Sequence, residues 1–176
     1  MIVILGASCS GKTTLYQNLK NLQNQNYIVS KEYTNRPKRI NEDTYNFITT
    51  KQYNEYERES LFAASFKVAV TDGLWRYGIL KSDTQKNSLI VTNPTNFRQL
   101  REFVTKDICS IYLKVPQNTR LIRMLNRGDE LSESYRRVIH DDGHFSGIDT
   151  MVNYVIDSLD SDEVCAQAIQ YINAYL

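Results

Sequence analysis

The chain has 176 residues, enough for one domain that buries roughly 70% of its unfolded surface, and short for two. Its 21 basic and 20 acidic residues leave a net charge of +1, which excludes a global electrostatic attraction to nucleic acid or to an anionic membrane. The three cysteines are far apart in the sequence, which favours reduced thiols over disulfides. No apolar run approaches the ~20 residues of a membrane span. We therefore expect a cytoplasmic protein, a monomer or homodimer, without nucleic-acid or membrane partners.

The first motif of the chain is G-A-S-C-S-G-K-T at residues 6–13, which matches the phosphate-loop pattern G-x-x-x-x-G-K-[ST]. An apolar run at residues 2–5 precedes it, and residues 14–22 carry leucines at helical spacing. A strand before the loop and a helix after it are the context that this motif requires. The sequence therefore predicts a nucleotide-phosphate site near the N-terminus.

The residue types of this loop suit the binding of a triphosphate. Gly6 and Gly11 permit backbone conformations that let successive N–H groups face one anion, and the start of the helix adds a partial positive charge. We expect Lys12 to reach the β- and γ-phosphates of ATP and the Thr13 hydroxyl to bind Mg²⁺. The predicted ATP-binding residues are Gly6, Ala7, Ser8, Cys9, Ser10, Gly11, Lys12, Thr13 and Thr14.

Strand-like runs alternate with helical patterns along most of the chain. The expected strands are residues 2–5, 27–29, 89–92, 108–115 and 154–157, and the expected helices are residues 50–58, 94–105, 117–127, 132–139 and 161–175. This βαβ alternation predicts an α/β fold with a mostly parallel central sheet and ligands at the carboxyl ends of its strands. Short β-rich pieces at 44–49, 61–66, 67–71 and 74–79 predict a small antiparallel insertion.

Two arginines beside a proline, Arg36 and Arg39, form a second candidate site. Their planar, permanently charged groups suit a dianionic phosphate, and the hydroxyls of Tyr45 and Tyr77 can add neutral donors. Taken alone, the two arginines are also compatible with solvated loop charges. Their position after a phosphate loop favours a role in holding the monophosphate of an acceptor.

Taken in order, these motifs resemble those of the guanylate kinases. The stretch Y-T-N-R-P-K-R-I-N-E (residues 33–42), followed by Y-N-F (45–47), is similar to their T-T-R-x-P-R-x-x-E and D-Y-x-F. W-R-Y-G (75–78) looks like their Y-Y-G, and N-R-G-D-E (126–130) looks like the R-G-[TSD]-E that opens their lid. The resemblance follows the whole chain, and its specificity lies in the order and spacing of short motifs.

The resemblance implies a fold and a division of the chain. The fold is that of a P-loop NTPase, with three αβα layers, a small antiparallel substrate-binding insertion and a helical lid. The chain would form a single kinase domain, residues 1–176. Its expected parts are a core at about 1–30, 80–127 and 150–176, an insertion at about 31–79 and a lid at about 128–149.

The resemblance also implies an activity and its residues. The chain would be an ATP- and Mg²⁺-dependent nucleoside monophosphate kinase, with small nucleotides as its partners, that phosphorylates a (d)NMP such as GMP or dGMP. Positive charge and positioning supply most of the catalysis in such a reaction. The implied catalytic residues are Lys12, Arg36, Arg127 and Arg136, with Arg137 as the alternative to Arg136. The implied substrate-binding residues are Arg36, Arg39, Tyr45, Tyr77 and Asn93.

The positions that read guanine in this family are not matched. L-F-A-A-S (residues 61–65) stands where the family has a glutamate in F-I-E-W-A, and Ile79 stands where it has Ser or Thr. Asn93 falls opposite an aspartate, and Glu32 falls opposite a serine. A carboxylate accepts hydrogen bonds from N1 and N2 of guanine, so its loss removes discrimination. The pattern favours a kinase with another, or a broader, acceptor.

Two further functions stay open. A sugar-phosphate kinase acting on ribose 1,5-bisphosphate would resemble this family while lacking its base readers. A non-catalytic guanylate-kinase-like binding module is disfavoured because Lys12 and Thr13 are intact. The segment from His140 to His144 looks like a metal site, but it lacks a third protein ligand, and Gly143 disfavours a helix there. We expect a flexible polar connection at that point.

Overall fold

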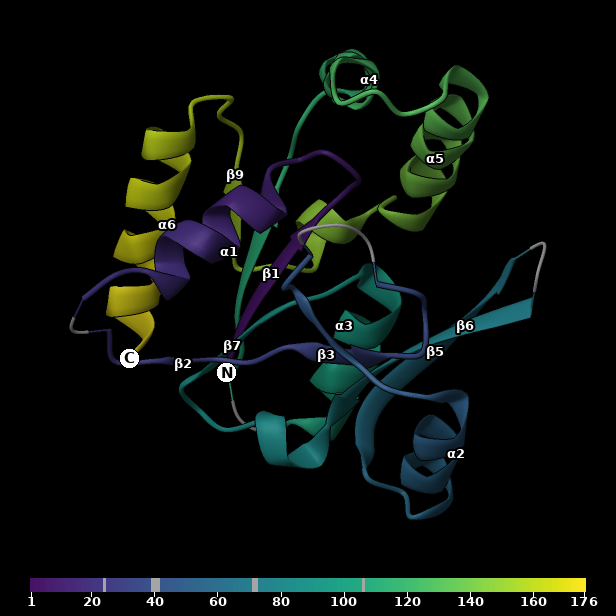
Figure 1. Cartoon of the computed structure of the whole chain (residues 1–176). Coiled ribbons are helices and arrows are strands. Elements are labelled where there is room, and N and C mark those ends of the chain that lie inside the picture. Colours follow the sequence, from purple (N-terminus) through teal and green to yellow (C-terminus); the bar gives the residue numbers. More distant parts are fainter. Residues whose placement is uncertain (24, 39–41, 71–72, 106) are drawn as a thin grey trace.

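The computed structural model describes residues 1–23, 25–38, 42–70, 73–105 and 107–176. Its central sheet has the strand order β2–β7–β1–β8–β9, and all of these neighbours pair in parallel (Figure 1). Strand β1 lies in the middle and is buried along its whole length, which explains its continuous apolar sequence. The strands are β1 (Ile2–Gly6), β2 (Ile28–Val29), β7 (Ser88–Val91), β8 (Cys109–Leu113) and β9 (Tyr154–Ile156).

Helices cover both faces of this sheet and complete three layers (Figure 1). On one face, Leu19 of α1 and Ile172 of α6 pack into a core with the buried side chains of β1 and β8. On the other face, Phe97 and Leu100 of α3 pack against Val3 and Leu5 of β1. The expected α/β architecture with a mostly parallel sheet is confirmed. The helices of these layers are α1 (Lys12–Lys20), α3 (Pro94–Phe103) and α6 (Ser161–Tyr175).

A second sheet has the order β4–β3–β6–β5 and extends from the core (Figure 1). Strands β3 and β5 both pair antiparallel with β6, as expected for the insertion. The pair β3 and β4 is parallel, with Tyr45 opposite Glu32, so the expected antiparallel pairing holds for only part of this sheet. The elements here are β3 (Glu32–Thr34), β4 (Tyr45–Phe47), α2 (Thr50–Arg58), β5 (Phe62–Val70) and β6 (Gly73–Leu80), with a short 3₁₀ turn at Lys81–Asp83.

Two helices, α4 (Gln117–Asn126) and α5 (Leu131–His144), lie above the carboxyl end of β1 (Figure 1). Helix α5 continues well past the expected residue 139, so the expectation of a flexible connection at residues 140–144 is wrong. Gly143 lies inside the helix because the flanking turns are fixed by contacts with α4 and the phosphate loop. A short 3₁₀ turn, Ile148–Thr150, then leads back to β9. Within the described part of the chain, no helix has both the length and the apolar character of a membrane crossing.

Candidate phosphate-binding site

The loop between β1 and α1 depends on its two glycines. Gly11 has φ 95°, a left-handed conformation that glycine adopts without strain. A Cβ atom on Gly6 would lie 2.3 Å from Ser10 Oγ, so a larger residue at that position would require the Ser10 side chain to move. Cys9 also has a positive φ, 58°, which completes the reversal of the chain before α1. The local sequence therefore sets the curvature of the loop.

Lys12 lies inside the curve of this loop. Its Nζ atom donates hydrogen bonds to the carbonyl oxygens of Gly6, at 2.5 Å, and Ala7, at 2.8 Å. Burial of the ammonium lowers the pKa of Lys12 from 10.5 to about 8, against the opposing effect of the nearby carboxylate of Asp141. The structure therefore places the ammonium of Lys12 against the loop carbonyls, and its predicted contact with nucleotide phosphates stays a prediction.

The loop has the features that a phosphate ligand requires. Ser10 Oγ is buried and finds no hydrogen-bond partner among the described residues. The positive φ values turn the backbone into a cradle that a Cβ on Gly6 would fill. Thr13, in the first turn of α1, is exposed beside this cradle, where a hydroxyl could bind Mg²⁺. These residues fit a nucleotide phosphate with its magnesium ion.

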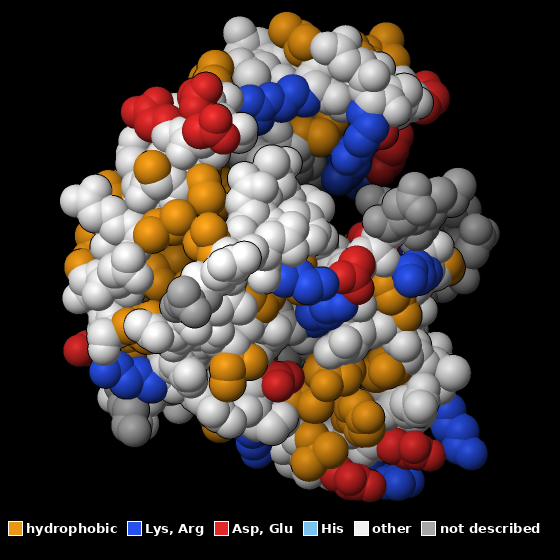
Figure 2. Space-filling view, turned by 60° about the vertical axis from the view of Figure 1, so that its left-hand side comes forward, with side chains coloured by type: hydrophobic (Ala, Val, Ile, Leu, Met, Phe, Trp, Pro, Cys, Tyr) orange, Lys and Arg blue, Asp and Glu red, His pale blue; other side chains and the backbone are white. Residues whose placement is uncertain are grey.

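Two cavities meet at this loop, and Cys9, Lys12 and Thr13 line both of them. The first, about 360 Å³, continues from the loop to Arg123 of α4 and to residues 158–164 before and within α6. The second, about 340 Å³, is enclosed by the loop, the second sheet and α5. Figure 2 shows lysine and arginine side chains around a hollow on one face of the molecule. The loop therefore separates two spaces, each large enough for part of a nucleotide.

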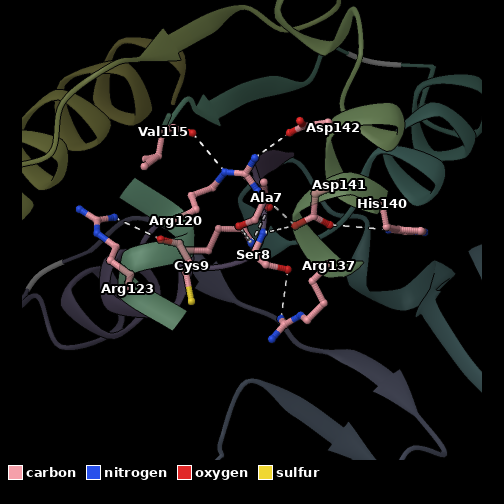
Figure 3. A network of polar contacts seen from close by, with 12 residues as sticks. Ala7, Ser8, Cys9, Val115, Arg120, Arg123, Arg137, His140, Asp141 and Asp142 are labelled. Atoms are coloured by element: carbon pink, nitrogen blue, oxygen red, sulfur yellow. Dashed lines mark hydrogen bonds and ion pairs between the residues drawn. The ribbon is translucent and has the colours of Figure 1, made fainter. Parts of the chain in front are cut away.

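Arginines of α4 and α5 lie around the loop (Figure 3). Arg123 donates to the carbonyl oxygen of Cys9 at 3.2 Å, and Arg137 donates to Ser8 Oγ at 3.0 Å. Arg120 is buried and donates to Val115 O at 3.2 Å and to Asp142 Oδ1 at 2.8 Å. The helices thus place positive charge around the loop.

The structure distinguishes between the predicted arginines of the lid. Arg127 lines both cavities and is bonded to Asp129. Arg136 points elsewhere: it is bonded to Glu133, and its side chain is 65% exposed. Arg137, the alternative to Arg136, is the one of the two that contacts the loop, because successive residues of a helix project about 100° apart.

A carboxylate that the sequence did not indicate also contacts the loop. The backbone N–H of Ser8 donates to Asp141 Oδ2 at 2.6 Å, and Arg120 Nη1 lies 3.5 Å from the same oxygen (Figure 3). His140 Nδ1 lies 3.7 Å from Asp141 Oδ1. Asp141 lies in the last turn of α5, far from Ser8 in sequence, so no local pattern could have revealed this contact.

The second cavity contains most of the predicted substrate-binding residues. Arg36 is buried, and its guanidinium donates to Glu42 Oε1 at 2.6 Å and to Pro37 O at 2.9 Å. The Tyr45 ring lies 5.4 Å from the Arg36 guanidinium carbon and 5.8 Å from the ring of Tyr77. Burial raises the pKa of Tyr45, so its hydroxyl stays a neutral donor. The predicted residue Arg39 lies outside the described part of the chain.

Glu32 is a buried acid in the wall of the same cavity. Its Oε1 atom accepts hydrogen bonds from Thr92 Oγ1 and from Asn96 Nδ2, the latter at 2.9 Å. Burial raises the pKa of Glu32 from 4.5 to about 7, although both hydrogen bonds act in the opposite direction. The sequence showed Glu32 only as a replacement for a serine, and its burial depends on the packing of β3 against α3.

The wall that β5 contributes to the second cavity differs from the guanylate kinase pattern given above. Ala64 is part of the apolar core, and Ser65 bonds through its backbone to Gln99. Phe66, stacked on Tyr77 at 4.8 Å, and Val68 line the cavity from β5. Asn93 lines it too, while its Oδ1 caps the start of α3. Within the described residues, the side of the cavity formed by β5 is therefore apolar.

The histidines at the end of α5 lie next to each other, with ring centroids 5.4 Å apart. His144 Nε2 is 2.8 Å from Thr95 Oγ1, and its pKa is lowered by burial. No group of three potential metal ligands of the His, Cys, Asp or Glu type occurs among the described residues.

Comparisons with known proteins show similarity to solved structures. Neither models of protein families nor curated protein sequences match the chain. The crystal structure of guanylate kinase from Anaplasma phagocytophilum is similar over 99% of this chain and 85% of that chain, with a TM-score of 0.70. The two sequences are 20% identical, so the similarity establishes the fold. This is an α/β fold with a mostly parallel central sheet, similar to the fold of that guanylate kinase.

Proposed function

We propose that this chain is an ATP-dependent nucleoside monophosphate kinase of the guanylate kinase type. The observation that carries this proposal is that one phosphate loop borders two cavities, with Lys12 on the boundary between them. Direct transfer of a phosphoryl group requires donor and acceptor oxygens to lie in line on either side of it. Two adjacent cavities that share a loop lysine provide such an arrangement.

The donor would bind in the cavity between the loop and α6. The ATP-binding residues proposed from the sequence, Gly6 to Thr14, form the loop and the first turn of α1. Backbone N–H groups and Lys12 would hold the β- and γ-phosphates, and Thr13 would hold the magnesium ion. When bound, that ion supplies charge neutralisation across the β- and γ-phosphates. Arg123 and Leu159 also line this cavity, and we propose that the nucleoside lies against them.

The acceptor would bind in the cavity between the two sheets. Arg36 and Arg39, with the hydroxyls of Tyr45 and Tyr77, would hold its phosphate. Arg36 is bonded to Glu42, and the carboxylate therefore occupies donors that an acceptor phosphate would use. Phe66 and Val68 offer an apolar surface for a base or a sugar.

Positive charge from the lid would stabilise the group in transfer. Arg127 borders both cavities, and Arg137 lies against the loop, so they are the two arginines that we assign to this role. We propose that residues 128–149 act as the lid and residues 31–79 as the substrate-binding insertion of a single kinase domain. Their approach would exclude water and limit hydrolysis of ATP.

A second candidate function is supported by the wall formed by β5. Because the described part of that wall presents Phe66 and Val68 and no carboxylate, specific reading of guanine is not favoured. An acceptor without a guanine base, such as ribose 1,5-bisphosphate, is compatible with the same phosphate contacts. A non-catalytic binding module is disfavoured by the complete phosphate loop.

A coupled assay of ADP release across GMP, dGMP, dTMP, CMP and ribose 1,5-bisphosphate tests the proposal. We expect turnover with at least one nucleoside monophosphate, and a broader acceptor range than a guanine-specific enzyme has. Turnover with the sugar phosphate alone would select the second candidate. Absence of turnover together with absence of Mg·ATP binding would exclude both kinases.

A further inference from the structure

We propose that the carboxylate of Asp141 is an internal occupant of the phosphate loop, and that the phosphates of a donor must displace it to bind. Asp141 of α5 would then compete with the nucleotide for the donors of the loop. The inference rests on the proposed function only in that the loop binds phosphate. It adds that Asp141, an acidic residue outside the loop motif, opposes the binding of phosphate.

The contact between Asp141 and the loop is direct and shielded from solvent. Asp141 Oδ2 accepts the backbone N–H of Ser8 at 2.6 Å, and the Asp141 side chain is 12% exposed. Backbone N–H groups of a phosphate loop are the donors that hold phosphate oxygens. A carboxylate oxygen bonded to one of them therefore takes a place that a phosphate oxygen would need.

The charges around Asp141 are those that a phosphate would meet. Arg120 Nη1 lies 3.5 Å from Oδ2, and Arg137 donates to Ser8 Oγ on the same residue of the loop. The ammonium of Lys12 is also close enough for Asp141 to favour its charged form. An oxyanion bonded to a loop amide, close to a guanidinium and an ammonium and with a second guanidinium on the same loop residue, has the surroundings of a bound phosphoryl group.

Displacement of Asp141 would link donor binding to the position of the lid. Asp141 and Arg137 lie on the same face of α5, one turn apart, and both contact Ser8. A donor phosphate that takes the Ser8 N–H breaks the bond to Asp141 and leaves Arg137 able to bond to the phosphate. The same exchange would replace a contact between α5 and the loop by a contact between α5 and the bound nucleotide.

Asp142 provides a matched control on the same helix. It carries the same charge and bonds to the same arginine, Arg120, at 2.8 Å. Its side chain is 42% exposed, and no contact with the loop is recorded for it among the described residues. Removal of either carboxylate takes one negative charge from the neighbourhood of Arg120, whereas only the loss of Asp141 frees the Ser8 N–H.

The test compares Asp141→Asn, Asp141→Ala and Asp142→Asn with the wild type, after thermal melting has shown that each variant is folded. Calorimetry measures the affinity for inorganic tripolyphosphate and for the magnesium complex of AMPPNP, a non-hydrolysable ATP analogue. Both Asp141 variants should bind tripolyphosphate more tightly than the wild type by about tenfold, within the usual range of coupling between sites. The Asp142 variant should differ from the wild type by less than about threefold, as for a screened charge.

A second measurement follows the Ser8 amide resonance by NMR. In the wild type, tripolyphosphate should shift this resonance as one acceptor replaces another, and Asp141→Ala should shift it without any ligand. Equal or weaker tripolyphosphate binding by both Asp141 variants, or an equal gain in Asp142→Asn, would overturn the inference. If the Asp141 variants gain affinity for tripolyphosphate while no protein binds Mg·AMPPNP, the inference stands and the proposed kinase function fails.

Discussion

Lys12 is the residue on which the proposed chemistry depends most. Its ammonium bonds to the carbonyls of Gly6 and Ala7, and Lys12 borders both cavities. A bound γ-phosphate would therefore replace these carbonyls as the acceptor of the hydrogen bonds from the ammonium. We predict that Lys12→Ala lowers turnover by about 10² or more, the usual effect of removing one donor to a developing charge. Steady-state kinetics measures the loss. Lys20→Ala, at the exposed end of α1, is the control and should keep wild-type turnover.

Glu32 makes the stability of the protein depend on pH. Because burial raises its pKa to about 7, the native state keeps a proton that the unfolded chain loses near pH 4.5. Stability should therefore fall as pH rises through this interval, by roughly 3 kcal/mol for Glu32 alone. Glu32→Gln cannot ionise, and its free energy of unfolding should change less between pH 5 and pH 8.

Urea denaturation of both proteins at the two pH values measures the difference. The wild type should lose stability relative to Glu32→Gln at pH 8 and approach it at pH 5. Parallel curves over the whole range would show that Glu32 does not hold its proton in the folded state.

The residues of the candidate site were accessible to sequence reasoning to different degrees. Lys12 and Thr13 belong to a contiguous motif whose geometry is set locally by two glycines. Arg137 and Asp141 reach the loop from more than a hundred residues away, and only the packing of α5 decides which side chains face it. Glu32 is buried through its contact with α3, and the sequence of its own strand does not indicate that contact.

Two glycines, one at the start of α1 and one within α5, should respond to alanine substitution with opposite changes in stability. Gly11 has φ 95°, so Gly11→Ala should be strained by about 1–2 kcal/mol although the space beside it is open. Gly143 lies within α5 with ordinary φ and no neighbouring atom within 4 Å of an added Cβ. Gly143→Ala should therefore stabilise the protein by about 0.5–1 kcal/mol through helix propensity.

Urea unfolding of the two alanine variants measures both effects against the wild type. Gly11→Ala should also weaken the binding of tripolyphosphate, because the loop reverses direction at that residue. Gly143→Ala should leave the backbone of the loop unchanged. A destabilised Gly143→Ala would mean that the end of α5 is not helical as described.

Elements with strong local signals were predicted best. The helix at residues 50–58 begins with a capping box of Thr49 and Gln52, and the helix at 161–175 begins with a cap by Asp160, and both have the predicted bounds. Strand β3 was missed because it has three residues and exists through its pairing with β4 and β6. Strand β5 was expected as two pieces, and its continuity depends on a long antiparallel pairing with β6.

At the scale of the whole molecule, the phosphate loop stands where three parts of the structure meet. The central sheet ends at the loop, the second sheet forms the far wall of one cavity, and α4 and α5 lie above both (Figure 1). The alternation of strands and helices predicted the central sheet and its layers. The cavities depend on contacts between distant segments, so the sequence could indicate their phosphate contacts but not the shape of the acceptor space.

The central claim is that this loop transfers a phosphoryl group from ATP to a nucleoside monophosphate. Incubation with Mg·ATP labelled in its γ-phosphoryl group, in the presence of a panel of (d)NMPs, tests it most directly by following the label chromatographically. We predict that the wild type places the label in a nucleoside diphosphate and that Lys12→Ala does not. Label that remains in ATP, or that appears in inorganic phosphate alone, would contradict the claim.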